Sequence, residues 1–279
     1  MLLAIDVGNT NTVLGLYSLD APELIADWRV TTHKNQTSDE YGVLFLSLFA
    51  MRQIEVSKIA AIVVSSVVPP LDTTIRRLCE RYFGLRPMFV EPGIKTGMPL
   101  LVDNPAELGA DRIVNGVAAF AHYGGPIIVV DFGTATTFDV ISARGEYIGG
   151  VIAPGLGISA DALFSRAAKL ARVDIKRPAR TIGTNTIAHL QSGLFYGYIG
   201  LVDGILERML AELQTSQPDG SPATPKVIAT GGLAPLFSEG TTLIEHIDPD
   251  LTLDGLRMLA ERNPAPTLSR DRVKALESD

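Results

Sequence analysis

The sequence predicts an α/β protein built from two similar lobes, and three observations lead to this prediction. The phrase LLAIDVGNTNTVLGLYS near the N-terminus returns 125 residues later as PIIVVDFGTATTFDVISA, which aligns Asp6 with Asp131. In each copy an apolar, strand-like run precedes the Asp, and a second one follows a Thr, aligned as Thr12 and Thr137. A third strand-like segment and then helical patterns follow both copies. A β-β-β-then-helices unit that occurs twice predicts two lobes of one kind with a cleft between them.

The first half, residues 1–122, is expected to form the N-terminal lobe. Thr37 or Ser38 is the expected N-cap of its first helix. Asn104 starts a short turn that Gly109 ends, and Asp111 begins a longer helix. In chain order the patterns predict strands at 2–5, 13–17 and 24–31, a helix at 37–51, a strand at 59–65, a helix at 71–83, a strand at 87–90 and a helix at 111–122.

The second half, residues 123–279, is expected to form the C-terminal lobe, because Tyr123-Gly-Gly-Pro breaks the preceding helix. It repeats the order of the first half. The patterns predict strands at 127–130, 138–141 and 146–152, helices at 159–171 and 186–212, a polar surface loop at 215–225, a strand at 226–229 and a helix at 253–262.

Composition excludes several classes of protein. The 279 residues are 46% hydrophobic and 20% charged, which is typical of a globular chain with a full core. The net charge is −7 and no run of Lys and Arg occurs, so nucleic acid is not an expected partner. Cys79 is the only cysteine, which excludes disulfides within the chain and cysteine-based zinc sites.

The sequence also predicts the cellular location of the protein. No basic region precedes the first apolar residues, so a signal peptide is not expected. The most apolar stretch, IAAIVVSSVVPPL from Ile59, is too short and too interrupted to span a bilayer. We therefore expect a cytoplasmic protein without a membrane partner.

The repeated turns have the composition of phosphate-binding loops. Gly, Asn and Thr at a hairpin tip offer backbone N–H groups and short polar side chains without bulk, which suits phosphate oxygens. The Asp before each tip adds a carboxylate, and oxygen ligands suit Mg²⁺. The alternative is an ordinary hairpin turn, where Asn and Gly are common. Two copies in register favour the phosphate site over that alternative.

With these motifs the chain resembles the type III pantothenate kinases, within the superfamily of acetate and sugar kinases, heat-shock chaperones and actin. The resemblance covers nearly the whole chain and rests on DVGNTNT at Asp6, SSVVP at Ser65, NPAELGADRIVN at Asn104, DFGTATT at Asp131, GGVIAPG at Gly149, Asn185-Thr186 and ATGGLA at Ala229. It implies two ribonuclease H-like lobes of the β-β-β-α-β-α type with the active site in the cleft between them. It also implies ATP-dependent phosphorylation of pantothenate to 4′-phosphopantothenate, the first step of coenzyme A biosynthesis.

The resemblance makes Asp111 the catalytic base. Phosphoryl transfer needs a group that accepts the proton of the attacking hydroxyl, and an Asp after Gly109-Ala110 suits that role. A plain helix cap is the alternative for Asp111. Arg112 can bind the carboxylate of pantothenate through two nitrogens, and a surface ion pair is its alternative. The pantothenate contacts implied by the resemblance are Gly109, Ala110, Asp111, Arg112 and Thr186.

The resemblance also assigns the cofactors ATP, Mg²⁺ and a monovalent cation, K⁺ or NH₄⁺. Asp6 is expected to hold Mg²⁺ through water, and Asp131 to bind the monovalent cation. Gly231 and Gly232 would let the adenosine lie against bare backbone. Val102 stands where many relatives have a substrate-contacting Tyr, so it is left out of the predicted site. The implied ATP contacts are Asp6, Val7, Gly8, Asn9, Thr10, Asn11, Thr12, Val13 and Thr134.

Two alternatives to this function are a kinase of the same fold acting on another small metabolite, and a nucleotide-binding regulatory relative without kinase activity. Intact Asp6, Asp111 and Asp131 argue against lost activity. The resemblance implies a homodimer, for which Phe195 and Tyr196, close to several glycines, could form a helix contact. Ordinary packing within the lobe is the alternative for this aromatic pair.

Overall fold

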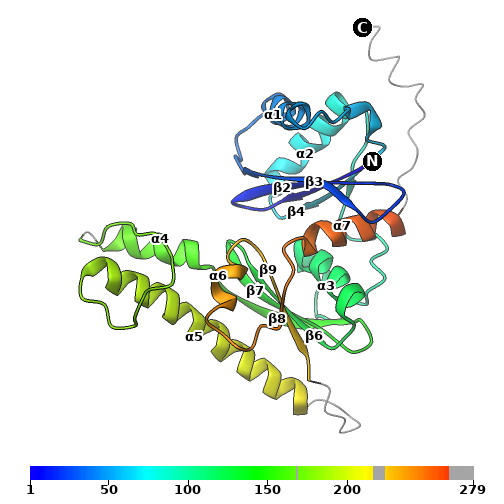
Figure 1. Cartoon of the computed structure of the whole chain (residues 1–279). Helices are drawn as coiled ribbons and strands as arrows, with labels where there is room; N and C mark the ends of the chain where they lie inside the picture. The colour runs from blue at the N-terminus through cyan, green and yellow to red at the C-terminus, as the bar shows by residue number, and fades with distance from the viewer. Residues whose placement is uncertain (168, 216–223, 264–279) are drawn as a thin grey trace. The chain divides into compact units, whose positions relative to one another are not determined.

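The structure is a computed structural model that describes residues 1–167, 169–215 and 224–263. The chain falls into two compact units, each with one five-stranded sheet and covering helices (Figure 1). The first unit contains Met1–Gly97, Ala106–Ala118 and the chain from Thr252, and the second contains Met98–Pro105 and Ala119–Leu251. The predicted α/β class with two similar halves is confirmed. The cleft and the division between residues 122 and 123 stay predictions.

The sheet of the first unit mixes antiparallel and parallel pairs. The spatial order is β3-β2-β1-β4-β5, with β1 antiparallel to β2 and parallel to β4. This order puts the Asp-bearing strand in the middle of the sheet, where both of its edges are paired. The strands are β1 (Leu2–Val7), β2 (Asn11–Tyr17), β3 (Leu24–Thr31), β4 (Ala61–Ser66) and β5 (Met88–Phe89).

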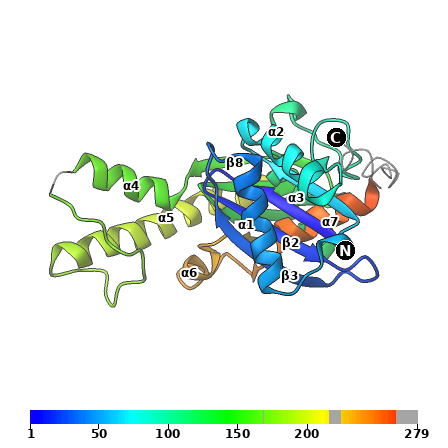
Figure 2. The ribbon, with the colours of Figure 1, turned by 90° about the horizontal axis from the view of Figure 1, so that it is seen from above.

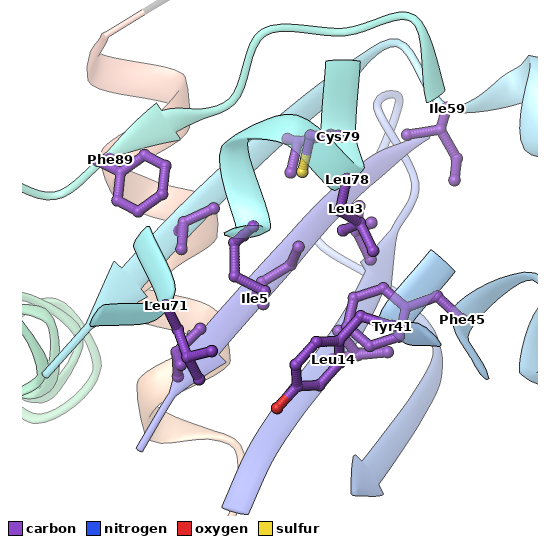
Figure 3. Close-up of a cluster of buried hydrophobic side chains, with 14 of the residues drawn as sticks. Leu3, Ile5, Leu14, Tyr41, Phe45, Ile59, Leu71, Leu78, Cys79 and Phe89 are labelled. Atoms are coloured by element: carbon purple, nitrogen blue, oxygen red, sulfur yellow. The ribbon is translucent and has the colours of Figure 1, made fainter. Parts of the chain in front are cut away.

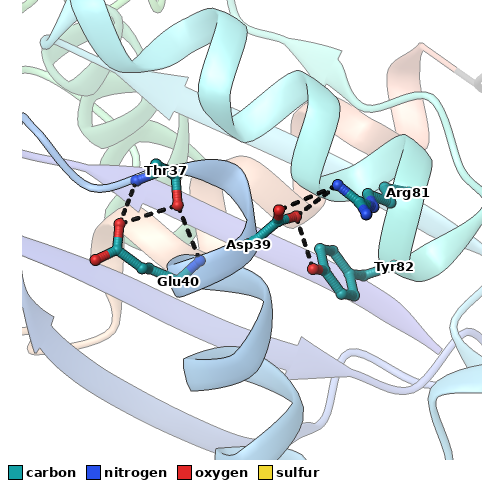
Figure 4. A network of polar contacts seen from close by, with 5 residues as sticks. All are labelled: Thr37, Asp39, Glu40, Arg81 and Tyr82. Atoms are coloured by element: carbon teal, nitrogen blue, oxygen red, sulfur yellow. Dashed lines mark hydrogen bonds and ion pairs between the residues drawn. The ribbon is translucent and has the colours of Figure 1, made fainter.

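The helix α1 (Ser38–Met51) starts at a capping box. The Thr37 hydroxyl accepts a hydrogen bond from the Glu40 N–H at 3.3 Å, and the Glu40 carboxylate accepts one from the Thr37 N–H at 2.7 Å (Figure 4). Thr37, one of the two predicted residues, is therefore the cap. In the same turn Asp39 accepts hydrogen bonds from Arg81 and Tyr82, which ties α1 to the end of the following helix (Figure 4).

A buried apolar cluster on one face of this sheet holds α1 and α2 (Pro69–Leu78) in place (Figure 3). It combines alternate residues of the central strands with aromatic residues of α1 and aliphatic residues of α2. The chain leaves α2 through a π-helical turn, Cys79–Phe83, where a continuous helix to residue 83 was predicted. Members of the cluster include Leu3, Ile5, Leu14, Tyr41, Phe45, Leu71, Leu78 and Phe89.

The opposite face of the same sheet is covered by α7 (Leu251–Arg262). Leu253 packs so closely on β2 that a Cβ at Gly15 would lie 2.9 Å from its Cδ1. The hydroxyl of Tyr17 donates a hydrogen bond to Asp254 at 3.0 Å. The last described helix of the chain thus belongs to the first sheet, although the sequence pattern placed it with the second half.

The second unit repeats the first sheet in strand order and direction. Its order is β10-β9-β6-β7-β8, with β6 antiparallel to β7 and parallel to β9. Both sheets also carry an irregularity at the same place, between Leu16 and Tyr17 in β2 and between Val140 and Ile141 in β7. The strands are β6 (Ile127–Phe132), β7 (Ala135–Ile141), β8 (Tyr147–Pro154), β9 (Lys226–Thr230) and β10 (His246–Ile247).

The alignment of the two copies needs one correction. Val7 pairs with Thr12 across the first hairpin, whereas Phe132 pairs with Thr136 across the second. The second turn is therefore one residue shorter, and Thr12 corresponds to Thr136 and not to Thr137. Both threonines are buried, at 0% and 1% exposure. The sequence alignment without a gap could not reveal this difference in turn length.

The helices of the second unit pack through an aromatic cluster. Phe132 stacks on Phe237 with ring centroids 5.5 Å apart, and Phe195 stacks on the same ring at 5.8 Å. Figure 2 shows α4 (Leu156–Arg166) beside the first half of the long α5 (Thr186–Thr215).

The helices of this unit differ in places from the prediction. The helix α4 ends five residues earlier than predicted. α6 (Ala234–Ser238) was not predicted, and most of the loop predicted at 215–225 lies outside the described residues.

In the described part of the chain, none of the helices combines the length and the apolar character needed to cross a bilayer.

Candidate active site

The turn between β1 and β2 is closed by a hydrogen bond from the Gly8 N–H to the Asn11 carbonyl oxygen at 3.0 Å. A Cβ on residue 8 would lie 2.9 Å from the same oxygen, so a larger residue there would have to shift the turn. Asn9 and Thr10 are exposed at the tip. The ammonium group of Lys34 donates a hydrogen bond to Asn9 Oδ1 at 3.1 Å. A cation next to the tip suits phosphate, and the sequence analysis missed Lys34 because nothing in its neighbourhood forms a motif.

Several residues of the predicted ATP loop have their side chains turned into the protein. Val7 is fully buried in the first core. Thr12 is also buried, and its hydroxyl is 2.9 Å from that of Thr32. Val13 is partly exposed. A contact of Val7 or Thr12 with a nucleotide would therefore use backbone atoms.

Asp6 is partly exposed at the end of β1, between Val13 of β2 and Ser65 of β4. Within the described ranges no three His, Cys, Asp or Glu side chains gather into a metal-binding group. A single carboxylate fits Mg²⁺ that keeps most of its water and binds phosphate oxygens, which is the usual arrangement for this ion. The residues around Asp6 are compatible with that kind of site.

The predicted substrate segment begins α3 (Ala110–Tyr123) in the first unit. The Asp111 carboxylate accepts a hydrogen bond from the Arg112 N–H at 2.8 Å. A Cβ on residue 109 would lie 2.5 Å from Asp111 Oδ1, so Gly109 leaves the space that this carboxylate occupies. Ala110 is buried at 8% exposure, and Arg112 is half-buried. The structure thus places Asp111 in the first turn of a helix, as predicted.

The environment of Asp111 changes its acidity. Burial raises the pKa of the Asp111 carboxyl above its ordinary value, and the N–H and positive charge of Arg112 oppose this shift only in part. A carboxylate with a raised pKa holds a proton more readily. This property suits a general base and would not be expected of an exposed helix cap.

In the second unit Asp131 stands at the end of β6 as Asp6 does in β1. The Gly133 N–H donates to the Ala135 carbonyl oxygen at 3.0 Å and closes the shorter turn. Gly231 has a φ of 90°, and a Cβ there would lie 2.7 Å from Asp131 Oδ1. Gly231, the first residue after β9, thus lies close to the second Asp, a proximity that the sequence alone did not predict.

Thr134 and Thr186 are both exposed in the second unit. Thr134 lies at the tip of the second turn, and Thr186 is the first residue of α5. The Asn185 side chain accepts a hydrogen bond from the Ala188 N–H at 2.9 Å, so Asn185 caps this helix. The neighbouring Thr186 hydroxyl is presented at the helix start.

Two buried polar pairs of the second unit escaped the sequence analysis. The hydroxyl groups of Thr136 and Tyr198 are hydrogen-bonded to each other, and both residues are buried. Tyr147 donates a hydrogen bond to the buried Asp139 at 2.6 Å. Tyr198 comes from α5 and Thr136 from β7, whereas Tyr147 and Asp139 are eight residues apart on the neighbouring strands β8 and β7. Neither pair belongs to a motif that the sequence analysis identified, so only the fold revealed them.

Comparison with known proteins identifies relatives along nearly the whole chain. A family model described as Type III pantothenate kinase matches residues 2–208. A Type III pantothenate kinase of Koribacter versatilis is 59% identical, and the match covers 98% of this chain and 100% of the relative. A Type III pantothenate kinase of Acidobacterium capsulatum is 54% identical, with 95% of this chain and 96% of the relative covered.

Solved structures agree with the fold. A Campylobacter jejuni protein assigned to the Baf family of transcriptional activators superposes with a TM-score of 0.57 at 20% identity, covering 94% of this chain and 98% of the other. A Sinorhizobium meliloti protein assigned as a 2-dehydro-3-deoxygalactonokinase superposes with a TM-score of 0.56 at 13% identity, covering 95% and 100%. At these identities the similarity shows the two-lobe α/β fold alone.

The buried carboxyl of Asp111 leads to a prediction about stability. Since its folded-state pKa is raised, the neutral form stabilises the fold, and this contribution is lost as the pH rises through the folded-state pKa. Asn is always neutral, and its Oδ1 can still accept the Arg112 N–H. We expect Asp111→Asn to raise the free energy of urea unfolding at about pH 8 and the gain to shrink towards the ordinary Asp pKa of about 3.9. The prediction would be contradicted if the gain in unfolding free energy were the same at about pH 8 and at about pH 3.9, or if the variant were less stable than the wild type at about pH 8.

Proposed function

Because the chain belongs to the type III pantothenate kinase family, we propose that it transfers the γ-phosphoryl group of ATP to the terminal hydroxyl of pantothenate. The product is 4′-phosphopantothenate, and the reaction is the first step of coenzyme A biosynthesis. The single observation that carries the proposal is the 59% identity to a pantothenate kinase over 98% of the chain. The Asp-bearing turn in each sheet supports the use of a nucleotide.

In this proposal the first turn binds the phosphates of ATP. Phosphoryl transfer is catalysed mainly by positioning and by neutralising charge on the phosphate oxygens. The exposed tip at Asn9 and Thr10 offers polar groups for those oxygens, and Lys34 adds positive charge next to Asn9. Asp6 would hold Mg²⁺ through water, and the ion would supply further positive charge. Thr134 is assigned a nucleotide contact from the second turn.

Asp111 is assigned the role of general base. Its carboxylate would accept the proton of the pantothenate hydroxyl while the hydroxyl oxygen attacks the γ-phosphorus and ADP leaves. Burial, which raises the pKa of Asp111, strengthens it as a proton acceptor. Arg112 is assigned to the pantothenate carboxylate because a guanidinium can donate two parallel hydrogen bonds to it. Gly109, Ala110 and Thr186 complete the proposed substrate contacts.

Asp131 is assigned to a monovalent cation, K⁺ or NH₄⁺. The turn that follows it reads FGTAT, so it offers hydroxyl and carbonyl oxygens where the first turn has amide side chains. Its Oδ1 also lies close to the backbone of Gly231. Such a set suits a large, weakly hydrated ion better than a compact Mg²⁺.

A homodimer and a cytoplasmic location are also part of the proposal. Phe195 is fully buried in its own core, so it is not available for a dimer contact. Gly193, Gly197 and Gly200 lie exposed along α5, and a second helix could approach there. Apart from the backbone of α5 itself, an added Cβ at these positions would meet no atom of the described residues within 4 Å. A monomeric mass by light scattering would contradict the dimer.

The proposed cytoplasmic location is supported by cysteine usage. The lone Cys79 fits the reducing conditions of the cytoplasm.

The test of the function is a coupled ADP-release assay of the purified chain. Pantothenate is compared with a panel of other small hydroxylated metabolites at fixed ATP and Mg²⁺. Release that depends on pantothenate supports the proposal. Release with another metabolite alone would favour a different kinase of this fold, and nucleotide binding without release would favour a regulatory protein.

The role of Asp111 predicts that Asp111→Asn loses most turnover while it keeps nucleotide binding. Asn cannot accept the proton, and the loss of a general base costs about 10²–10⁴ in rate. Asp20→Asn is the matched control, because Asp20 is an exposed loop residue of the same unit. Steady-state rates with pantothenate measure the effect. Full activity of Asp111→Asn in a variant that unfolds in one cooperative transition would place the base elsewhere.

The role of Asp131 predicts that the rate rises with K⁺ or NH₄⁺ at constant Mg²⁺ and ionic strength, and that Asp131→Ala abolishes this rise. Initial rates are measured in tetramethylammonium buffer titrated with KCl against a balancing salt. Asp161→Ala is the control, since Asp161 lies on α4 of the same unit in an exposed ion pair with Arg172. A wild-type enzyme equally active without K⁺ or NH₄⁺ would refute the cation site and leave the kinase proposal intact.

A further inference from the structure

A buried hydroxyl without a hydrogen-bond partner lies at the end of β4. Ser65 is 0% exposed, and its Oγ has no hydrogen-bond partner among the described residues. A polar group in this situation is rare and calls for an explanation, because burial removes its water without a replacement. The adjacent Ser66 behaves differently: its hydroxyl donates to Asp72 at 2.5 Å and accepts from the Val68 N–H at 3.2 Å.

The strand register places Ser65 next to Asp6. β1 and β4 are parallel, and Asp6 is the residue paired with Ser65. Ile5 and Val64, their neighbours, both belong to the apolar cluster under α1 and α2. Because side chains alternate along a strand, Asp6 and Ser65 share the opposite face of the sheet. Adjacent strands are about 4.8 Å apart, so the hydroxyl and the carboxylate are within reach of each other.

The second sheet contains the same arrangement. Asp131 is paired with Thr230 on the parallel strand β9, and Thr230 is 2% exposed. Each of these two hydroxyl residues is the only polar one among the buried residues of its strand, β4 or β9. Packing alone would favour an apolar residue at both positions. A hydroxyl at the same register in two strands of different sequence indicates a role that is tied to the Asp.

We propose that Ser65 is a positioning residue for Asp6. When the Mg²⁺–nucleotide complex is bound, its hydroxyl donates a hydrogen bond to one oxygen of the Asp6 carboxylate and leaves the other oxygen for the water of the ion. The bound carboxylate then has one orientation, and the buried hydroxyl gains its partner. This inference rests on the proposed function of Asp6 in the nucleotide half of the site.

The test is Ser65→Ala, with binding of a non-hydrolysable ATP analogue followed by calorimetry as Mg²⁺ is varied. We expect the Mg²⁺ concentration for half-maximal binding to rise about 10-fold or more, as when hydrogen-bond partners of metal ligands are removed. The KM for pantothenate stays unchanged. Since the hydroxyl has no partner in the free protein, the unfolding temperature without ligand does not fall.

Two further variants separate positioning from packing. Ser65→Thr keeps a hydroxyl at this position, as Thr230 provides one at the matching position of the second sheet. This variant is expected to retain the wild-type Mg²⁺ dependence. Ser66→Ala is the matched control in the same strand: it loses the hydrogen bonds to Asp72 and Val68 and is expected to lower the unfolding temperature without a change in Mg²⁺ dependence.

Wild-type Mg²⁺ dependence in Ser65→Ala would overturn the inference, and so would an equal weakening of nucleotide and pantothenate binding. The calorimetric measurement contains no pantothenate. A wild-type protein that binds the Mg²⁺–nucleotide complex and fails to phosphorylate pantothenate would therefore refute the proposed function, while the effect of Ser65→Ala would still support the role of Ser65.

Discussion

The pairing of each Asp-bearing strand with a parallel neighbour is the constraint on which the candidate site depends. β1 lies between β2 and β4, and β6 lies between β7 and β9, so both strands are paired on both edges. Each Asp stands at the point where its strand ends and a glycine-closed turn begins. A shift in register by one residue would exchange Asp6 with Ile5 between the polar and the apolar face. The apolar core on one face therefore determines which side chains the other face presents.

The three predicted carboxylates differ in the structural element that carries each of them, and this difference matches their proposed chemistry. Asp6 and Asp131 are partly exposed and stand at strand ends beside glycine-closed turns. Asp111 lies in the first turn of α3, and desolvation of its carboxyl by the surrounding protein raises its pKa. The desolvation that makes Asp111 a better proton acceptor also disfavours its ionised form in the folded protein. Gly109 makes this arrangement possible, because a side chain there would occupy the space of the carboxylate.

Much of the fold could be predicted because its signals are short-range. The alternation of apolar residues and the Gly-Asn-Thr turn identify the β1–β2 hairpin without any tertiary information. The capping box at Thr37 marks the start of α1 within four residues. The internal repeat adds the second sheet, since the same local pattern occurs around Asp131. For the candidate site, the sequence identified Asp6, Asp111 and Asp131 by their motifs.

The tertiary structure decided what depends on contacts between distant segments. Local signals were enough to predict the two-sheet α/β class, the chain order of strands around each Asp and the helix that begins near Asp111, because each follows from periodicity and turn chemistry within a few residues. Only the folded chain put α7 on the first sheet, shortened the second turn so that Thr136 matches Thr12, raised the pKa of Asp111 and set Ser65 beside Asp6. Strand register and burial depend on which surfaces pack together, and no local pattern specifies that choice.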